Sequence, residues 1–334
     1  MVAAERRCRV GRSARLGRPA RRLSPAGLSP GRRGFRPGRG LAARDGRRTG
    51  LDRPAAAAAA DRGAPGRTDA TSVYGYAGPI TSAAPVAPDL VAGFHRTLRQ
   101  GLVERGAVTL FARLHPLLEQ LPQLVGMGEL ERLGDTVSID LRQPPAAQLG
   151  AYRSNHRRDL ARLERRGYRT TITDNPGDLA AFAALYHENM RRVHARPQYF
   201  FDAAYFDRLA LALGPALALA SCHQDGQLVG GALFMRHGPF VQYHLGAVSD
   251  RHVAAAPAKQ LIDAARRHFH AAGAELLHLG GGRGAAEDSL FHFKAGFSPR
   301  RHAFRVWRWI IDADTYGRLA EGKPATDFFP AYRG

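Results

Sequence analysis

Cysteine, lysine and long apolar runs are the scarce features of this chain of 334 residues. Cys8 and Cys222 are the only cysteines, so a disulfide framework is excluded, and neither lies at the spacing of a metal site. No apolar run approaches the roughly 20 residues that span a bilayer, and no signal-peptide core follows the basic start. These absences predict a protein of a reducing compartment, the cytoplasm, without a transmembrane segment.

Lysine is replaced almost everywhere by arginine: Lys259, Lys294 and Lys323 stand against 46 arginines, which is typical of a GC-rich gene. Much of the arginine lies at the start. Residues 1–70 contain 18 arginines and five acidic residues, and so carry a net +13 of the formal +20. This stretch has too few large apolar residues to offset the entropy of ordering a chain, and we expect residues 1–68 to be disordered.

Three interpretations of this Arg/Gly/Pro/Ala-rich segment compete. It would serve as a basic arm for nucleic acid or anionic lipid, because such charges displace counterions. An organelle-targeting peptide is the second interpretation, although glycine and proline interrupt the amphipathic pattern that such peptides need. The third is that GC-rich DNA has been read in a wrong frame or upstream of the true start, so that the segment has no selected function. We prefer the third.

Familiar catalytic motifs are missing as well. The chain has no HExxH or CxxC pattern, and we therefore expect no metal site. It also lacks the GxxxxGK[ST] loop of P-loop nucleotidases, and its one GxSxG match, at residues 27–31, lies in the Arg/Gly segment and not at the strand-to-helix turn of a serine-hydrolase elbow. These enzyme classes would be without their standard parts.

Periodic patterns begin after residue 69 and alternate between helix and strand. Asp89 is expected to cap the first helix and Gly106 to stop it, and Asp225-Gly226 is a hairpin signal. The pattern predicts a mixed α/β fold, a mostly antiparallel sheet flanked by helices. Helices are expected over about 89–105, 152–166, 177–193, 202–213, 256–272 and around 290, and strands over 107–114, 135–141, 168–174, 216–223, 227–236, 239–248, 275–280 and 301–312.

The most informative segment is a glycine run between a strand and a helix. Gly280, Gly281 and Gly282 follow the strand, and the chain restarts as a helix near Asp288 or Ser289, either of which would cap it. Successive glycine amides and a helix start favour an anion or a developing oxyanion, and Arg283 would reinforce that charge. An ordinary turn followed by a capped helix explains the same sequence, and both interpretations of the glycine run stay open.

Lys294 is a rare lysine set between Phe291, Phe293 and Phe297. An ammonium group in apolar surroundings is a compact stabiliser of a carbonyl or phosphate oxygen. The alternative is a surface lysine whose stem covers the aromatic rings. The spacing does not decide between the two.

A basic helix and a strand histidine are further candidates. Arg157 and Arg158 belong to a helix rich in arginine, which is either a solvated face or an anion-binding one. Tyr243 and His244 alternate on a strand, so only one of them faces inward. A strand histidine is most often a satisfied core residue.

Taken together, several segments resemble the FemAB-like branch of the GNAT acyltransferases, a bacterial group that includes peptidoglycan bridge-building aminoacyl transferases. The resemblance covers about residues 69–312, and the arginine helix and the FKAGF segment are its most specific parts. The segments that carry it are YGYAGP, RLHPLL, SNHRRDLARLERRGY, FFDAAYFDRL, DGQLVGGALF, QYHLGA and LHLGGG followed by DSLFHFKAGF.

The resemblance implies a GNAT-like fold with an incomplete second GNAT-like half. We expect a partial first half over residues 69–150, an acyltransferase domain over 151–320 and a tail over 321–334. By the same resemblance Lys294 lies near the acyl-transfer centre and is the catalytic residue. The residues expected to bind substrate are Arg157, Arg158, Tyr243, His244, Gly280, Gly281, Gly282 and Arg283.

The chain departs from the family pattern in two places. Family members have ordered strands before the YGYAGP segment, where this chain has its Arg/Gly segment. Acetyl-CoA-dependent GNAT enzymes have a glycine-containing loop where this chain has residues 250–260, which contain no glycine. The backbone there cannot make the usual pyrophosphate cradle. The donor is therefore either an acyl-CoA such as acetyl-CoA or an aminoacyl-tRNA.

The expected reaction is transfer of an acyl or aminoacyl group onto a primary amine of a small molecule or cell-wall precursor, by direct attack of the amine. The general base and the oligomeric state stay open. A rival interpretation is a non-catalytic relic of the fold that binds nucleic acid or a cell-wall precursor. A third is an RNA-binding arm at the N-terminus attached to an enzyme.

Overall fold

The computed structural model describes residues 58–59, 66–73, 75–81, 86–324 and 327–334. Most of the segment predicted to be disordered, residues 1–68, lies outside the described residues. Its described end takes part in the sheet, because β1 (Ala58–Ala59) pairs with β2 (Thr68–Thr71).

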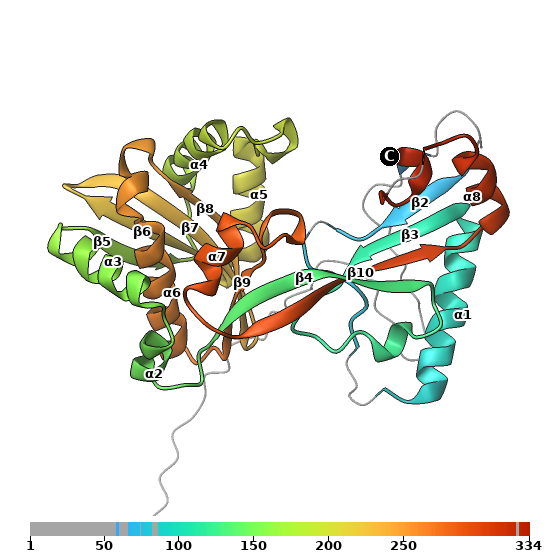
Figure 1. The fold of residues 1–334 in the computed structure, drawn as a ribbon, viewed down its shortest axis with the longest axis horizontal. Coiled ribbons are helices and arrows are strands. Elements are labelled where there is room, and N and C mark those ends of the chain that lie inside the picture. Colours follow the sequence, from blue (N-terminus) through green and yellow to red (C-terminus); the bar gives the residue numbers. More distant parts are fainter. Residues whose placement is uncertain (1–57, 60–65, 74, 82–85, 325–326) are drawn as a thin grey trace, which may run out of the picture. The chain divides into compact units, whose positions relative to one another are not determined.

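One sheet of ten strands runs through the described part, in the order β1-β2-β3-β10-β4-β9-β8-β7-β6-β5 (Figure 1). Neighbouring strands are antiparallel except for the pairs β2–β3 and β8–β9. The expected fold class, a mostly antiparallel sheet flanked by helices, is confirmed. The remaining strands are β3 (Ala107–Arg113), β4 (Glu129–Asp140), β5 (Arg169–Asp174), β6 (Leu217–Gln224), β7 (Gln227–His237), β8 (Phe240–Val248), β9 (Leu276–Gly280) and β10 (Arg301–Ile310).

Helices cover both faces of the sheet around β6 to β8, because successive side chains of these strands alternate between the faces. On one face Phe182 and Phe206 of α4 and α5 pack on Leu217 and Leu233. On the other face the α3, α6 and α7 helices bury a second cluster. The helices are α1 (Pro88–Glu104), α2 (Pro145–Gly150), α3 (Ser154–Arg165), α4 (Ala180–Arg192), α5 (Ala203–Leu213), α6 (Ala258–Ala271), α7 (Ser289–Ala295) and α8 (Ala313–Ala320).

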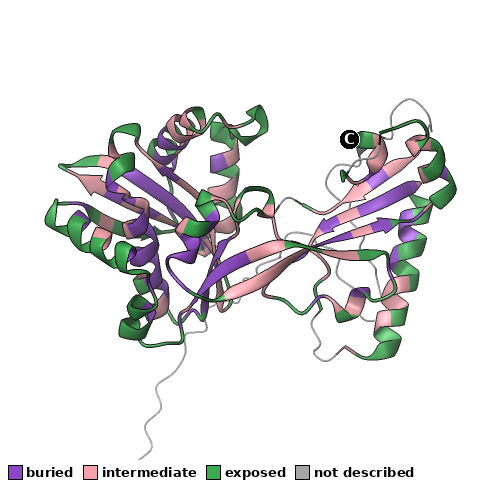
Figure 2. Ribbon diagram, viewed as in Figure 1, coloured by how far each residue is buried: buried purple, intermediate pink, exposed green. Residues whose placement is uncertain are grey.

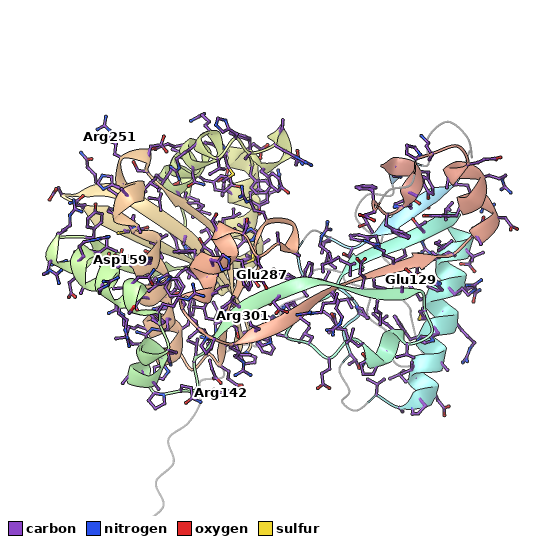
Figure 3. The ribbon with its side chains drawn as sticks, in the orientation of Figure 1. Glu129, Arg142, Asp159, Arg251, Glu287 and Arg301 are labelled. Atoms are coloured by element: carbon purple, nitrogen blue, oxygen red, sulfur yellow. The ribbon has the colours of Figure 1, made fainter. Side chains whose placement is uncertain are left out.

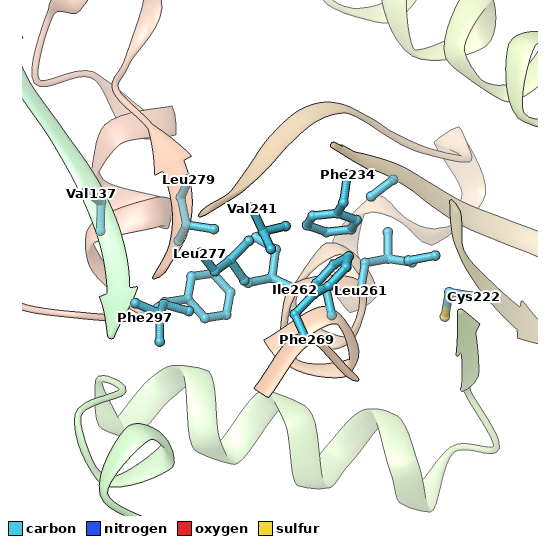
Figure 4. Packing of buried hydrophobic residues seen from close by; sticks show 14 of the residues in the cluster. Val137, Cys222, Phe234, Val241, Leu261, Ile262, Phe269, Leu277, Leu279 and Phe297 are labelled. Carbon is cyan, nitrogen blue, oxygen red and sulfur yellow. The ribbon is translucent and has the colours of Figure 1, made fainter. Parts of the chain in front are cut away.

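The largest buried cluster lies between the sheet and the α6 and α7 helices. Phe234 of β7, Leu261 and Phe269 of α6, and Phe297 just after α7 come together there (Figure 4). Figure 2 shows the same burial along the middle strands and the inner side of α6. Burying such side chains stabilises a fold by about 1.5–3 kcal/mol each, and this packing holds α7 against the sheet at β4.

The final strand β10 lies between β3 and β4 and is antiparallel to both. Its Trp307 and Trp309 are buried in a cluster with Leu98 and Leu102 of α1. A segment from the end of the chain thus supplies core side chains to the sheet that begins the described part. The domain boundaries at residues 150 and 320 stay a prediction.

Local expectations held where a residue type fixed the backbone. Asp225 and Gly226 both have positive φ, 50° and 76°, as a two-residue hairpin requires. Asp89 as the cap of α1 was wrong, since Ala87 holds that position without a side-chain hydrogen bond. Proline at the first helical position, here Pro88, starts a helix without a capping side chain because its fixed φ suits the first turn. The short α2 and α8 were not expected.

Candidate active site

The parallel strands β8 and β9 part soon after they meet. Their pairing covers only Phe240–Gln242 and Leu276–His278, although β8 runs on to Val248. Strand β9 then ends at Gly280, whose φ of +77° turns the chain toward α7. The point of divergence therefore gathers the end of β9, the middle of β8 and the side chains of α7.

Lys294 projects from α7 into this place, and only 8% of the residue is exposed. Its Nζ donates a hydrogen bond to the Gly281 carbonyl oxygen at 2.6 Å and lies 6.0 Å from the centre of the Tyr243 ring. Burial lowers the pKa of the amine from 10.5 to about 8, against the opposing attraction of Asp288. A buried amine whose charge is easily lost is typical of a functional site.

The glycine run allows backbone and side chains to come close together. A Cβ on Gly280 would lie 3.1 Å from Tyr76 Oη and 3.4 Å from Lys294 Nζ. On Gly282 a Cβ would meet the Ala286 carbonyl oxygen at 2.0 Å. A side chain is thus excluded at Gly282, whereas at Gly280 it would be strained by the positive φ and would crowd Tyr76 and Lys294, which converge on the main chain there.

Asp288 caps the start of α7 and is one of the two residues expected to do so. Its Oδ1 accepts a hydrogen bond from the Phe291 amide at 3.0 Å, and its Oδ2 accepts one from Arg283 Nε at 2.8 Å. Burial would raise the pKa of Asp288, but these hydrogen bonds outweigh it and lower the pKa to about 2. The carboxylate of Asp288 thus occupies the N-terminus of α7 and forms an ion pair with Arg283. The positive charge of Arg283, expected to attract an anion to the glycine run, is therefore already paired. Substrate binding by Arg283, Gly280, Gly281 and Gly282 stays a prediction.

Tyr243 and His244 point to opposite faces of β8, as their alternation predicts. Tyr243 packs on Phe234 with ring centres 5.5 Å apart, on the face that holds Lys294, and burial raises its pKa to about 12. His244 Nε2 instead lies 2.8 Å from the Tyr205 hydroxyl of α5, and burial lowers its pKa to about 4. Only Tyr243 joins the Lys294 site, and a role of His244 with substrate stays a prediction.

The basic helix α3 supports the site from outside. His156 is buried and its Nε2 lies 2.9 Å from the Phe293 carbonyl oxygen of α7. Asp159, which projects from α3 in Figure 3, pairs with the buried Lys259 of α6. Arg157 and Arg158 are exposed on α3, away from the contacts of Lys294, and their substrate-binding role stays a prediction.

Four aromatic and imidazole side chains complete the site, and sequence reasoning gave them no role. The His278 ring of β9 lies 5.0 Å from the Tyr76 ring and 6.1 Å from that of His115. The His302 ring of β10 lies 6.5 Å from His278 on a third side. The signal was available, because His278 and Gly280 are two residues apart on one strand and so share a face.

The described ranges contain neither a cluster of metal-ligating side chains nor a helix that could span a membrane. Histidine, cysteine, aspartate and glutamate nowhere gather there in a group of three that would hold a metal ion. None of the helices there combines the length and apolar character that crossing a bilayer requires.

Comparison with known proteins identifies the domain. Residues 150–294 match the model of an acetyltransferase (GNAT) domain. A crystal structure of FemX resembles the chain with a TM-score of 0.59 and 14% identity, covering 76% of this chain and 83% of FemX. A conserved protein of unknown function from Bacteroides thetaiotaomicron gives a TM-score of 0.52 and 12% identity over 67% of this chain and 76% of that one.

A third solved structure is the C-terminal domain of a putative lysylphosphatidylglycerol synthetase from Agrobacterium fabrum. It shows 19% identity and a TM-score of 0.47 over 68% of this chain and 73% of that one. No curated protein matches the sequence. The expected GNAT membership is confirmed by the family model, and the likeness to FemX shows a common fold. Residues 150–294 form a GNAT acetyltransferase domain, and the protein is an acyltransferase with the fold seen in FemX.

Proposed function

We propose that the protein is an N-acyltransferase that moves an acyl or aminoacyl group from an activated donor to a primary amine, with Lys294 as its catalytic residue. The observation that supports this most is the buried amine of Lys294 beside Gly281, at the point where β8 and β9 part. A cation held in a low-dielectric place acts on a developing oxyanion far more strongly than one in water.

Lys294 has enough hydrogen-bond donors to stabilise an oxyanion. An ammonium group carries three N–H donors, and its one hydrogen bond within the described ranges goes to Gly281 O. Two N–H groups remain for the carbonyl oxygen of a donor thioester or ester. As the acceptor amine attacks the carbonyl carbon, negative charge grows on that oxygen beside the cation. The adduct then collapses to the amide and releases the thiol or alcohol, without a covalent enzyme intermediate.

The loop before α6 favours an aminoacyl-tRNA over an acyl-CoA as donor. It forms the 3-10 turn η4 (Asp250–Ala255), and Ala256 follows in the left-handed region with φ 59°. The amides of Lys259, Gln260 and Leu261 already donate to the carbonyl oxygens of residues 256 and 257. These amides are the ones that would otherwise cradle a pyrophosphate. The exposed Arg157 and Arg158 of α3 would then contact phosphates of the tRNA.

A cell-wall precursor with a free primary amine is the acceptor class that the FemAB-like resemblance implies, and such a reaction takes place in the cytoplasm. A single panel separates the alternatives. Acetyl-CoA and an alanyl-tRNA are each offered as donor, with lysine amide and a muropeptide precursor as acceptors, and new amide is measured by mass spectrometry.

We expect turnover with at least one pair, and about a thousandfold loss of kcat in Lys294→Ala with substrate affinity nearly unchanged. Lys323→Ala, which removes an exposed lysine, is the matched control and should keep full activity. Binding of a muropeptide or tRNA without turnover by any pair would instead support the non-catalytic relic. Deleting residues 1–67 and measuring salt-dependent RNA binding tests the basic arm separately.

A further inference from the structure

His278 is the most deeply buried titratable side chain of the site, with 1% of the residue exposed. It lies on the same face of β9 as Gly280, the residue on which Tyr76 and Lys294 converge. The charge of Lys294 reaches this histidine and lowers its pKa, yet the oxyanion mechanism gives His278 no task.

A chain of hydrogen bonds fixes the tautomer of this histidine. The Tyr243 carbonyl oxygen can only accept, so the Gln242 atom 2.6 Å from it must be the amide nitrogen. The Gln242 oxygen therefore faces His278 Nδ1, at 2.6 Å. Because that oxygen is also an acceptor, Nδ1 must carry the proton. The other ring nitrogen, Nε2, then holds a bare lone pair in the neutral ring.

His278 Nε2 is buried and has no hydrogen-bond partner among the residues that the structure describes. A buried polar atom without a partner destabilises the folded state, so a fold rarely leaves one without reason. The rings around it are those of Tyr76, His115 and His302. Burial first, and then the charges of His115, His302 and Lys294, hold the pKa of His278 well below its usual 6.5. The ring is therefore neutral, and its Nε2 lone pair has no donor among the described residues.

Both ring nitrogens of the buried His156 have a polar atom within hydrogen-bond distance, Asn155 Oδ1 at 3.1 Å and the Phe293 carbonyl oxygen at 2.9 Å, whereas His278 Nε2 has none among the described residues. A metal ligand would need partners, and none of the described groups qualifies as a metal cluster. The feature that remains is a lone pair to which none of the described residues donates an N–H or O–H.

We propose that His278 Nε2 accepts a hydrogen bond from the nucleophilic amine of the acceptor and then takes its proton. This assignment rests on the proposed function and supplies the general base of that reaction. Gln242 is the positioning residue, because its amide keeps the proton on Nδ1 and the lone pair on Nε2.

The proton that the amine loses is finally carried by the leaving group. The amine nitrogen forms a bond to the acyl carbon, and its acidity rises as that bond forms. Its N–H proton then passes to Nε2, which gives an imidazolium. When the bond from carbon to the leaving sulfur or oxygen breaks, the same proton goes to that atom. The ring returns to its neutral form with the proton on Nδ1.

Two substitutions separate the two nitrogens. Asparagine places its amide nitrogen near Nδ1, so His278→Asn keeps the hydrogen bond to Gln242 and removes the Nε2 lone pair. Glutamine places its amide near Nε2, so His278→Gln retains a hydrogen-bond acceptor that cannot take a proton. His270→Asn is the matched control, since His270 bonds the Leu141 carbonyl oxygen at the far end of α6.

The first measurement needs no substrate. Nitrogen-15 NMR of the full chain at pH 7, with the His278 signals identified by their loss in His278→Asn, should show a neutral ring protonated at Nδ1. Gln242→Leu should shift the proton toward Nε2. A wild-type ring protonated at Nε2, or charged at pH 7, would overturn the assignment whether or not an acyl donor has been found.

The second measurement uses the donor and amine that give turnover in the panel. His278→Asn should lower kcat by about a hundredfold or more with KM within about threefold, and abolish the acid limb of the pH profile. His278→Gln should show the same loss of kcat, and His270→Asn none. Full activity in a correctly folded His278→Asn, judged by its circular dichroism, would overturn the proposal. Turnover by no pair would refute the proposed function and leave the NMR result as the separate test of His278.

Discussion

Replacing Lys294 by methionine should raise the stability of the protein while it destroys activity. Methionine has a similar length and no charge, and fits irregular apolar gaps. In the native protein only 8% of Lys294 is exposed, and burial lowers the pKa of its ammonium group to about 8. The charged form is thus less favourable in the folded state than in the unfolded chain.

The free energy that this buried charge costs the folded state follows from the shift of the pKa of Lys294. One pKa unit corresponds to about 1.4 kcal/mol, so a change from 10.5 to about 8 amounts to roughly 3 kcal/mol. Below pH 8 both states hold the proton and the full cost is present. Between pH 8 and 10.5 the unfolded chain binds more protons than the folded one, and stability therefore rises with pH.

The assay is denaturant unfolding of wild type and Lys294→Met at several pH values from 7 to 10. At pH 7 the variant should be more stable by about 1–2 kcal/mol, because the roughly 3 kcal/mol gained is reduced by the loss of the hydrogen bond to Gly281 O. Above pH 8 the wild type should regain stability relative to the variant by about 1.4 kcal/mol per pH unit. Other titrating groups are common to both proteins and cancel. A stability difference that does not change with pH would refute the reasoning.

Three further outcomes are expected. Gly280→Ala should lose activity and about 1–2 kcal/mol of stability, because the φ of Gly280 is +77° and the added Cβ would crowd Lys294. The control Gly284→Ala also has a positive φ but no neighbour within 4 Å, so it should lose stability and keep its activity. Turnover and denaturant unfolding of the two variants measure these effects. Asp159→Asn should destabilise by about 2 kcal/mol in denaturant titration, because it leaves the buried Lys259 without its carboxylate, and an unchanged midpoint would contradict this. The rate of acyl transfer should fall as pH rises through about 8, because the cation of Lys294 is lost there, and a rate that rises instead would make the neutral amine the base.

The sequence predicted the strands and helices well wherever the pattern was local. β-branched or apolar runs bounded by turn residues predicted strands β5 to β9 to within a few residues, and Gly106 and Gly167 take the positive φ expected of helix ends. Short elements such as α2 were missed, because six residues carry too little periodicity. Lys294 could be singled out because lysine is so rare in this chain.

The rest of the site depends on contacts that no local pattern contains. Tyr76, His115, His278 and His302 come from four segments, and the sheet order that places β10 between β3 and β4 brings them together. Side-chain hydrogen bonds decided other details. The pairing of Asp288 with Arg283, for example, depends on a turn geometry that the glycine run permits, and the amino-acid sequence does not reveal that geometry.

The most direct test of the central claim is the titration of the Lys294 amine itself. With lysine labelled by carbon-13 and nitrogen-15, the chain gives signals from three side chains, and the one lost in Lys294→Met belongs to Lys294. The buried position beside Gly281 predicts a midpoint near pH 8. A midpoint at the ordinary value of 10.5 would mean that the amine lies in water, and it would contradict an acyl-transfer site built around it.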